Sequence, residues 1–158
     1  MNLAWGQILA LVGAGLSVLG GGLGSAKAVR TAGQAGAGVV SENPDTFGQV
    51  LVMQLLPGTQ GVYGFLIAFI VLIKTGFLGG MIDLSLTQGL QIFLGCLPIT
   101  IVGGLSAVYQ GQMAAAGITM TGRNPELGGR GITMTVMVET YAVLALLASF
   151  LMVNAIKL

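Results

Sequence analysis

Two stretches of the chain, "ENPDTFGQVLVM" at residues 42–53 and "RNPELGGRGITM" at residues 123–134, are related copies of one segment. Their Asn-Pro pairs begin at positions 43 and 124, so the copies are offset by 124 − 43 = 81 residues. A repeat of this length decides which unit a fold is built from. The sequence therefore predicts two related halves, residues 1–80 and residues 81–158.

Charged residues are rare and unevenly spread. The chain of 158 residues is 54% hydrophobic and 7% charged, with a mean hydropathy of +0.92, whereas a soluble domain carries about 25% charged residues. A membrane-spanning helix takes about 20 predominantly apolar residues. Four stretches are long enough: the one before Lys27, the one from Asp45 to Lys74, the one from Asp83 to Arg123, and the one from Arg130 to Lys157, which only Glu139 interrupts. We predict an all-α membrane protein whose four transmembrane helices form two tandem hairpins, the second of which carries Glu139.

The positive charges predict how the chain lies in the cell membrane. Four of the six Lys and Arg residues flank the two Asn-Pro connections, and only Lys74 and Lys157 mark the other side. By the positive-inside rule, both connections face the cytoplasm and both termini lie outside. A signal peptide has a basic residue before its apolar run. No basic residue precedes the N-terminal apolar run of this chain, so we expect that run to be the first membrane helix.

Small residues recur every fourth position in the first and third predicted helices. They are Gly20, Gly24, Ala28, Ala32 and Gly36 in the first, and Gly103, Ala107, Gly111 and Ala115 in the third. Such stripes let helix backbones approach closely in lipid. A hairpin of one slim and one bulky helix is a wedge, and wedges close into a homo-oligomeric ring with the slim helices inside. Ordinary packing within a monomer fits the stripes equally well, but the 27 glycines favour the ring.

Several function classes are excluded or disfavoured. The net charge of +1 and the absence of a patch of aromatic and basic residues argue against nucleic-acid binding. Cys96 is the only cysteine, which excludes an internal disulfide and gives no support for a cysteine metal site. The stretch "GGGLGSAKA" at residues 20–28 lacks the Gly-Lys-Ser/Thr ending of a phosphate-binding loop. We predict no catalytic residues.

Glu139 is the feature that most needs a functional explanation. At 1.5 Å per residue it lies about 13 Å along its helix from Arg130 and about 27 Å from Lys157, within the hydrocarbon. A charged side chain at mid-membrane costs about 2.5 to 3.5 kcal/mol on insertion scales, so it faces protein or water, is protonated, or is paired with a cation. The spans contain no Arg, Lys or His partner. The candidates are a proton, a metal cation, or a cation from another protein.

Polar residues gather at the same depth. Four residues of the second helix share one helical face at the spacing i, i+3, i+4 and i+7: Leu56, Thr59, Gln60 and Tyr63. Gln110 adds a polar side chain in the third helix. Pro57 has no N–H, so the Met53 carbonyl loses its helical partner. The second helix therefore brings a hydroxyl, an amide oxygen and a free backbone oxygen near the carboxylate.

These groups favour a monovalent cation. Hard cations take oxygen ligands, and one carboxylate with neutral oxygens makes a neutral pair with Na+ that passes through lipid. A proton needs only the carboxylate and one partner, so the chemistry favours Na+ and leaves H+ open. The structural alternative is a set of hydrogen bonds between helices. For Tyr63 that alternative is the better one, and we expect it to donate to the Glu139 carboxylate.

The two hairpins, the segments "PGTQGVYGF" at residues 57–65 and "VMVETYAV" at residues 136–143, and the segment around Gln110 resemble the proteolipid K subunit of bacterial vacuolar-type rotary ATPases, in particular the sodium-pumping kind. The resemblance covers essentially the whole chain. It implies a ring in lipid that turns against a stator membrane subunit. A central stalk connects such a ring to a cytoplasmic head that hydrolyses ATP, so the chain itself is not an enzyme.

The resemblance also implies the roles of six residues, at which the chain shows no departure from the family pattern. The sodium ligands would be the backbone oxygen of Leu56 and the side chains of Thr59, Gln60, Gln110 and Glu139, with Tyr63 holding the carboxylate in place. The role of Leu56 is implied by the resemblance alone. The transported ion would be Na+, with H+ as the alternative.

Two other classes of membrane protein fit four helices and one buried acid. A small proton/cation antiporter needs an aromatic-lined chamber around the acid, but the aromatic content is only 6% and the glycine stripes favour tight packing. In a purely structural or channel-forming protein Glu139 would be incidental, and neutralising it would leave transport intact. Both fit the sequence less well than the rotor ring.

Overall fold

The computed structural model describes residues 3–158. Its elements are, in order, α1 (Trp5–Glu42), a 3-10 turn (Pro44–Thr46), α2 (Phe47–Leu55), a 3-10 turn (Leu56–Gly58), α3 (Thr59–Lys74), α4 (Leu86–Pro98), a π-helical segment (Ile99–Gly103), α5 (Gly104–Arg123), a 3-10 turn (Pro125–Leu127) and α6 (Gly128–Ala155). The fold described is all-α, as predicted.

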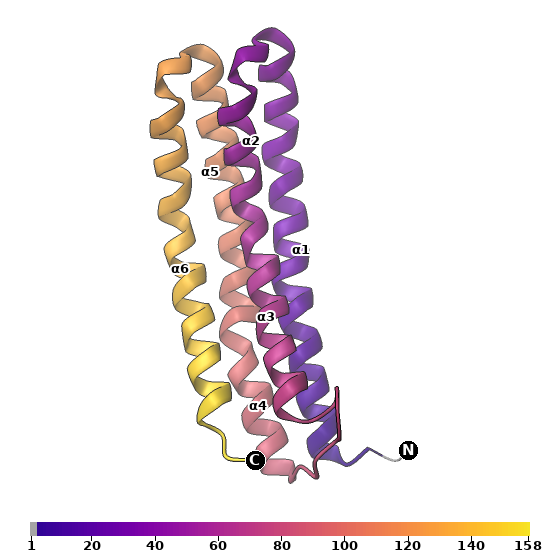
Figure 1. The fold of residues 1–158 in the computed structure, drawn as a ribbon. Helices are drawn as coiled ribbons and strands as arrows, with labels where there is room; N and C mark the ends of the chain where they lie inside the picture. Colours follow the sequence, from indigo (N-terminus) through magenta and orange to yellow (C-terminus); the bar gives the residue numbers. More distant parts are fainter. Residues whose placement is uncertain (1–2) are drawn as a thin grey trace.

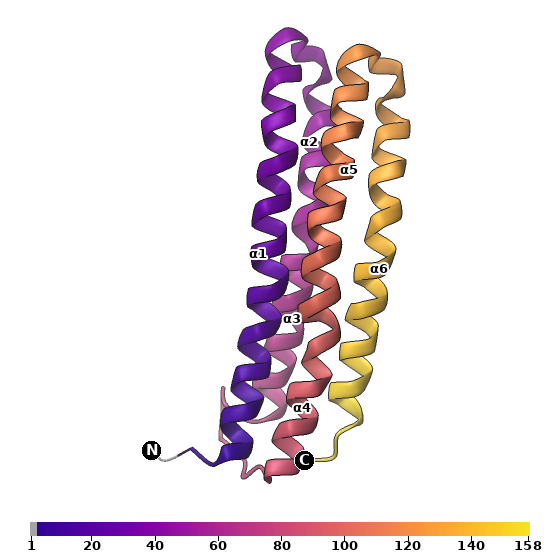
Figure 2. The same ribbon diagram turned by 180° about the vertical axis from the view of Figure 1, so that it is seen from behind.

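These elements form four rods that are long and apolar enough to cross a membrane: Trp5–Glu42, Pro44–Lys74, Leu86–Arg123 and Pro125–Ala155. The prediction of four transmembrane helices is confirmed. The rods run side by side, with both termini at one end and the two Asn-Pro connections at the other (Figure 1). The view from behind shows α1 and α5 next to each other, in front of α2 and α3 (Figure 2).

Each Asn-Pro pair ends a helix in the same way. Asn43 and Asn124 leave the helical conformation with φ of −138° and −146°, because the proline that follows disfavours the helical region for the residue before it. The proline then begins a 3-10 turn that leads into the return helix. At the opposite end, Gly76 with φ of +73° turns the chain between the two hairpins, a conformation open to glycine.

Close approach of the backbones holds α1 against the π-helical segment and α5. A Cβ atom added at Gly20 would overlap the backbone of Thr100, and one added at Gly24 would overlap the backbone of Gly104. These glycines belong to the small-residue stripes, which allow backbones to touch in lipid. The slim helices are thus neighbours within one chain, and α3 and α6 lie to one side of them.

Prolines interrupt two of the rods. Pro57 cannot donate a helical hydrogen bond, and the helix tightens there into the 3-10 turn between α2 and α3. Pro98 precedes the π-helical segment, where the Ile99 N–H donates to the Ser149 hydroxyl of α6 at 3.0 Å. Both interruptions lie within the membrane spans, and the one at Pro57 directly precedes Thr59.

Candidate ion-binding site

The Glu139 carboxylate is half-buried on α6 and receives four hydrogen-bond donors. The hydroxyls of Thr59 and Tyr63 each lie 2.6 Å from Oε1. The Nε2 atoms of Gln110 and Gln60 lie 2.7 Å and 3.4 Å from Oε2. Since a buried charge is costly unless it is hydrogen-bonded, this shell makes a carboxylate tolerable in the membrane.

Three rods meet at the carboxylate. α3 begins immediately after the Pro57 turn and places Thr59, Gln60 and Tyr63 on its face toward α6. α5 contributes Gln110, which like Gln60 is fully buried. The structure therefore brings together all five side chains that the sequence and the resemblance indicated.

The two glutamines fix one another. Gln60 Nε2 donates to Gln110 Oε1 at 2.5 Å, and Gln110 Nε2 also donates to the backbone carbonyl of Thr135 at 3.2 Å. Each amide is thus tied to a second group besides the carboxylate. This arrangement holds the two amide groups and the carboxylate in a fixed relation.

The backbone oxygen at the cluster is that of Leu56. The Thr59 hydroxyl lies 2.9 Å from it, because the 3-10 turn directs this carbonyl at the residue three positions on. The proline position pointed instead to the Met53 carbonyl, one helical turn earlier, and that expectation stays a prediction. The Met53 side chain is fully buried in an apolar cluster with Ala114 and Ile118.

Three oxygens surround the Thr59 hydroxyl. Glu139 Oε1, the Leu56 carbonyl and Gln60 Oε1 lie within 3.4 Å of Thr59 Oγ1. The hydroxyl carries one hydrogen, so it donates to one of the three at a time. The Leu56 carbonyl also accepts from the Thr59 N–H, and Glu139 Oε1 also accepts from Tyr63. A carboxylate, a backbone carbonyl and an amide oxygen therefore meet at one hydroxyl.

Two supporting contacts were missed by the sequence analysis. Ser25 of α1 is buried, and its hydroxyl accepts a hydrogen bond from the N–H of Gly61 at 2.9 Å, beside Gln60. The other is the Thr135 carbonyl described above. Ser25 lies beside Gly24 of the small-residue stripe, which indicates packing, and a backbone carbonyl leaves no mark in the sequence. Only the polar character of Ser25 in an apolar span could have pointed to it.

Comparison with known proteins places the chain in a family. The model of the ATP synthase C-subunit family matches residues 12–71 and again residues 93–152. The chain is 43% identical over 148 residues to the V-type sodium ATPase subunit K of Enterococcus hirae, covering 94% of this chain and 92% of that protein. It is 40% identical over 147 residues to the A-type ATP synthase subunit K of Methanocaldococcus jannaschii, covering 92% of this chain and 61% of that protein.

The chain therefore belongs to the ATP synthase C-subunit family, and the resemblance found in the sequence is confirmed. It is a multi-pass membrane proteolipid of a rotary ATPase, a subunit that translocates ions and is not the part that hydrolyses ATP. The division into halves at residue 80 stays a prediction.

Proposed function

We propose that copies of this chain form the membrane rotor ring of a rotary ATPase, and that each copy binds and carries one Na+ at Glu139. The observation that carries the proposal is the oxygen cluster on a single membrane-embedded carboxylate. The relative from Enterococcus hirae is named as a subunit of a sodium ATPase, which supports Na+ as the ion.

The proposed ligands are the Leu56 carbonyl, the Thr59 hydroxyl, the amide oxygens of Gln60 and Gln110, and the Glu139 carboxylate. Hard cations take such oxygens, which replace the hydration shell of the ion. One carboxylate neutralises one Na+, whereas a divalent ion would keep a net charge in lipid. A proton carrier would need the carboxyl and one partner, so two fully buried glutamines favour Na+.

The ring would carry the neutral pair past lipid. Each copy loads its ion at Glu139 from one side, and the ring turns against a stator membrane subunit. A positive side chain of the stator would displace the ion toward its exit path, and a central stalk would link the ring to the ATP-hydrolysing head. We place both Asn-Pro connections on the cytoplasmic side, because four Lys and Arg residues flank them.

A single carboxylate on four helices favours pumping over synthesis. A ring of given helix count then moves half as many ions per turn as a ring with one carboxylate per hairpin. Moving each charge against the membrane potential costs about 2.3 kcal/mol per 100 mV. Fewer ions per ATP therefore allow the complex to pump against a steeper gradient. Net ATP synthesis by the complex under a modest, measured ion gradient would count against this assignment.

The transport test uses the assembled ATPase in proteoliposomes, with ATP added outside and radioactive Na+ uptake followed over time. We expect Glu139→Gln to abolish uptake, because the carboxylate is lost. Glu126→Gln, which neutralises the exposed carboxylate of the second Asn-Pro connection, is the matched control and keeps the wild-type rate. ATP-driven acidification that is independent of Na+ would instead assign the ring to protons, and unchanged uptake in Glu139→Gln would refute the site.

A further inference from the structure

Equivalent positions of the two halves, 81 residues apart, have opposite burial on the slim helices. Gly13, Gly20, Gly24 and Ala28 of α1 lie against α4, the π-helical segment and α5 of the same chain. Their equivalents at +81 are Leu94, Ile101, Leu105 and Tyr109, which we call the α4–α5 stripe. All four stripe residues are large, and they are between 45% and 59% exposed. The surface of α1 that the second half covers is therefore open at the equivalent positions of the second half.

The residues that cover α1 also have equivalents in the other half, at the same offset. Gly13 meets the backbone of Phe93 and the side chain of Cys96, Gly20 meets Thr100, and Gly24 meets Gly104. Their equivalents at −81 are Val12, Gly15, Leu19 and Leu23, which we call the α1 stripe. Its three large residues are between 46% and 69% exposed, and a Cβ added at Gly15 would meet nothing within 4 Å.

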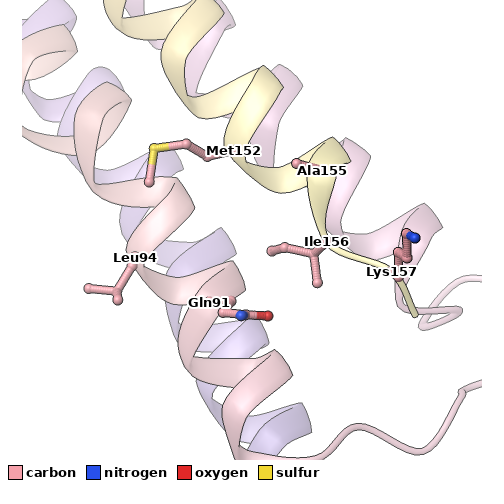
Figure 3. Close-up of a pocket in the computed structure, with 6 residues that line it drawn as sticks. All are labelled: Gln91, Leu94, Met152, Ala155, Ile156 and Lys157. Carbon is pink, nitrogen blue, oxygen red and sulfur yellow. The ribbon is translucent and has the colours of Figure 1, made fainter.

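A groove of about 500 Å³ between α4 and α6 follows the same rule. In Figure 3, Met152 and Ile156 extend from α6 toward α4, where Gln91 and Leu94 form the other wall. The equivalents of these four lining residues in the first half are Val71, Thr75, Ala10 and Gly13, all of them buried in the same chain. The first half has no open groove there because α4 and α6 fill it.

We propose that the α4–α5 stripe and this groove receive helix α1 of a second copy, with Leu94 over Val12 and Gly15, Ile101 against Leu19, and Leu105 against Leu23. The proposal rests on the proposed ring, in which the second copy is the next subunit, and adds the register of the contact. Large residues replace the glycines of the contact within one chain. Neighbouring slim helices are therefore closer within a copy than between copies.

The same comparison separates this surface from the lipid-facing one. Three pairs of equivalent positions on the outer helices are exposed in both halves: Val62 and Val143, Leu66 and Leu147, Phe69 and Phe150. A pair of equivalent positions that is exposed in both halves faces lipid. A pair that is buried in one half and exposed in the other faces protein. The α4–α5 stripe belongs to the second kind, which argues for a second copy over lipid as its occupant.

The first test is cysteine cross-linking in assembled membranes, in a Cys96→Ser background that has no other thiol. A disulfide needs Cα atoms about 4.4 to 6.8 Å apart, and the proposed register places Ile101 of one copy against Leu19 of the next. Leu19→Cys combined with Ile101→Cys is therefore expected to give a ladder of oligomers on oxidation. Each single variant, and the control pair Leu19→Cys with Phe69→Cys, should stay monomeric on denaturing gels. A ladder from the control pair and none from the stripe pair would overturn the register.

The second test adds a side chain at one of two open glycines. Gly15 and Gly38 both have space within the chain, but the equivalent of Gly15 is the fully buried Cys96 and the equivalent of Gly38 is the exposed Thr119. We expect Gly15→Leu to lower the yield of rings relative to single chains about tenfold or more, and Gly38→Leu to leave it unchanged. Equal yields for the two variants would contradict the proposal.

The outcomes distinguish this inference from the proposed function. If wild-type rings form and transport Na+ but the stripe pair gives no ladder, the register is wrong and the rotor function stands. If the wild-type chain forms no ring at all, both are refuted.

Discussion

Replacing Thr59 with valine removes one hydroxyl from the oxygen cluster and keeps the shape of the side chain. That hydroxyl lies 2.6 Å from Glu139 Oε1 and 2.9 Å from the Leu56 carbonyl. A hydrogen bond to a charged group contributes about 1.5 to 3 kcal/mol, and each 1.4 kcal/mol is a factor of ten in affinity. We therefore expect Thr59→Val to weaken Na+ binding about 10- to 100-fold.

The assay is equilibrium binding of radioactive Na+ to purified rings. Thr140→Val is the matched control, because Thr140 is the equivalent of Thr59 in the second half. Its hydroxyl makes the same local bond, to the Met137 carbonyl at 2.9 Å, but is exposed on α6. The control should bind Na+ within about twofold of wild type. Wild-type affinity in Thr59→Val, or an equal loss in Thr140→Val, would refute the assignment of Thr59 as a ligand.

Three further variants test the site and the fold. Tyr63→Phe removes one donor to the Glu139 carboxylate and should weaken Na+ binding about 3- to 10-fold in the same assay; unchanged binding would show that the phenol is idle. Lys74→Met removes the ammonium that donates to the last carbonyls of α6 and should lower the free energy of unfolding by about 1 kcal/mol. Thermal denaturation in detergent measures this change, and an unchanged midpoint would contradict the prediction. Gly24→Leu drives a side chain into the backbone of Gly104 and should cost about 3 kcal/mol or more; a wild-type yield of folded protein would contradict the close contact.

The four helices were predictable because charged residues separate the apolar stretches of the chain. All of the Lys, Arg, Asp and Glu residues except Glu139 lie outside the four apolar stretches of the sequence, and each proline of an Asn-Pro pair marks a helix end. The face that carries Thr59, Gln60 and Tyr63 was also accessible, since helical spacing alone places them together. Glu139 stood out because a carboxylate is rare in a membrane span.

The rotation of each helix about its axis was not accessible in this way. In a soluble helix the polar face marks the side away from the core, but here both the lipid-facing and the buried faces are apolar. Spacing therefore did not show that Gln110 faces Glu139, that Ser25 supports Gly61, or that Ser149 receives the Ile99 N–H. The place of the Leu56 carbonyl beside Thr59 was hidden for a related reason. The missing N–H of Pro57 identifies only a lost helical bond, whereas the 3-10 turn sets the direction of the Leu56 carbonyl.

The half-repeat supplies part of this information. Under the proposed ring, a position buried in one half and exposed in the other belongs to a surface that a second copy covers. A position exposed in both halves faces lipid.

Carbodiimide labelling of Glu139 in membranes, titrated with Na+ at several pH values, tests the central claim most directly, because the reagent attacks protonated carboxyls in apolar surroundings. The account predicts that millimolar or lower Na+ protects Glu139 and that K+ at the same concentration does not. Protection by rising pH alone, with no effect of Na+, would contradict the account and leave Thr59, Gln60 and Gln110 as hydrogen-bonding partners of a proton carrier.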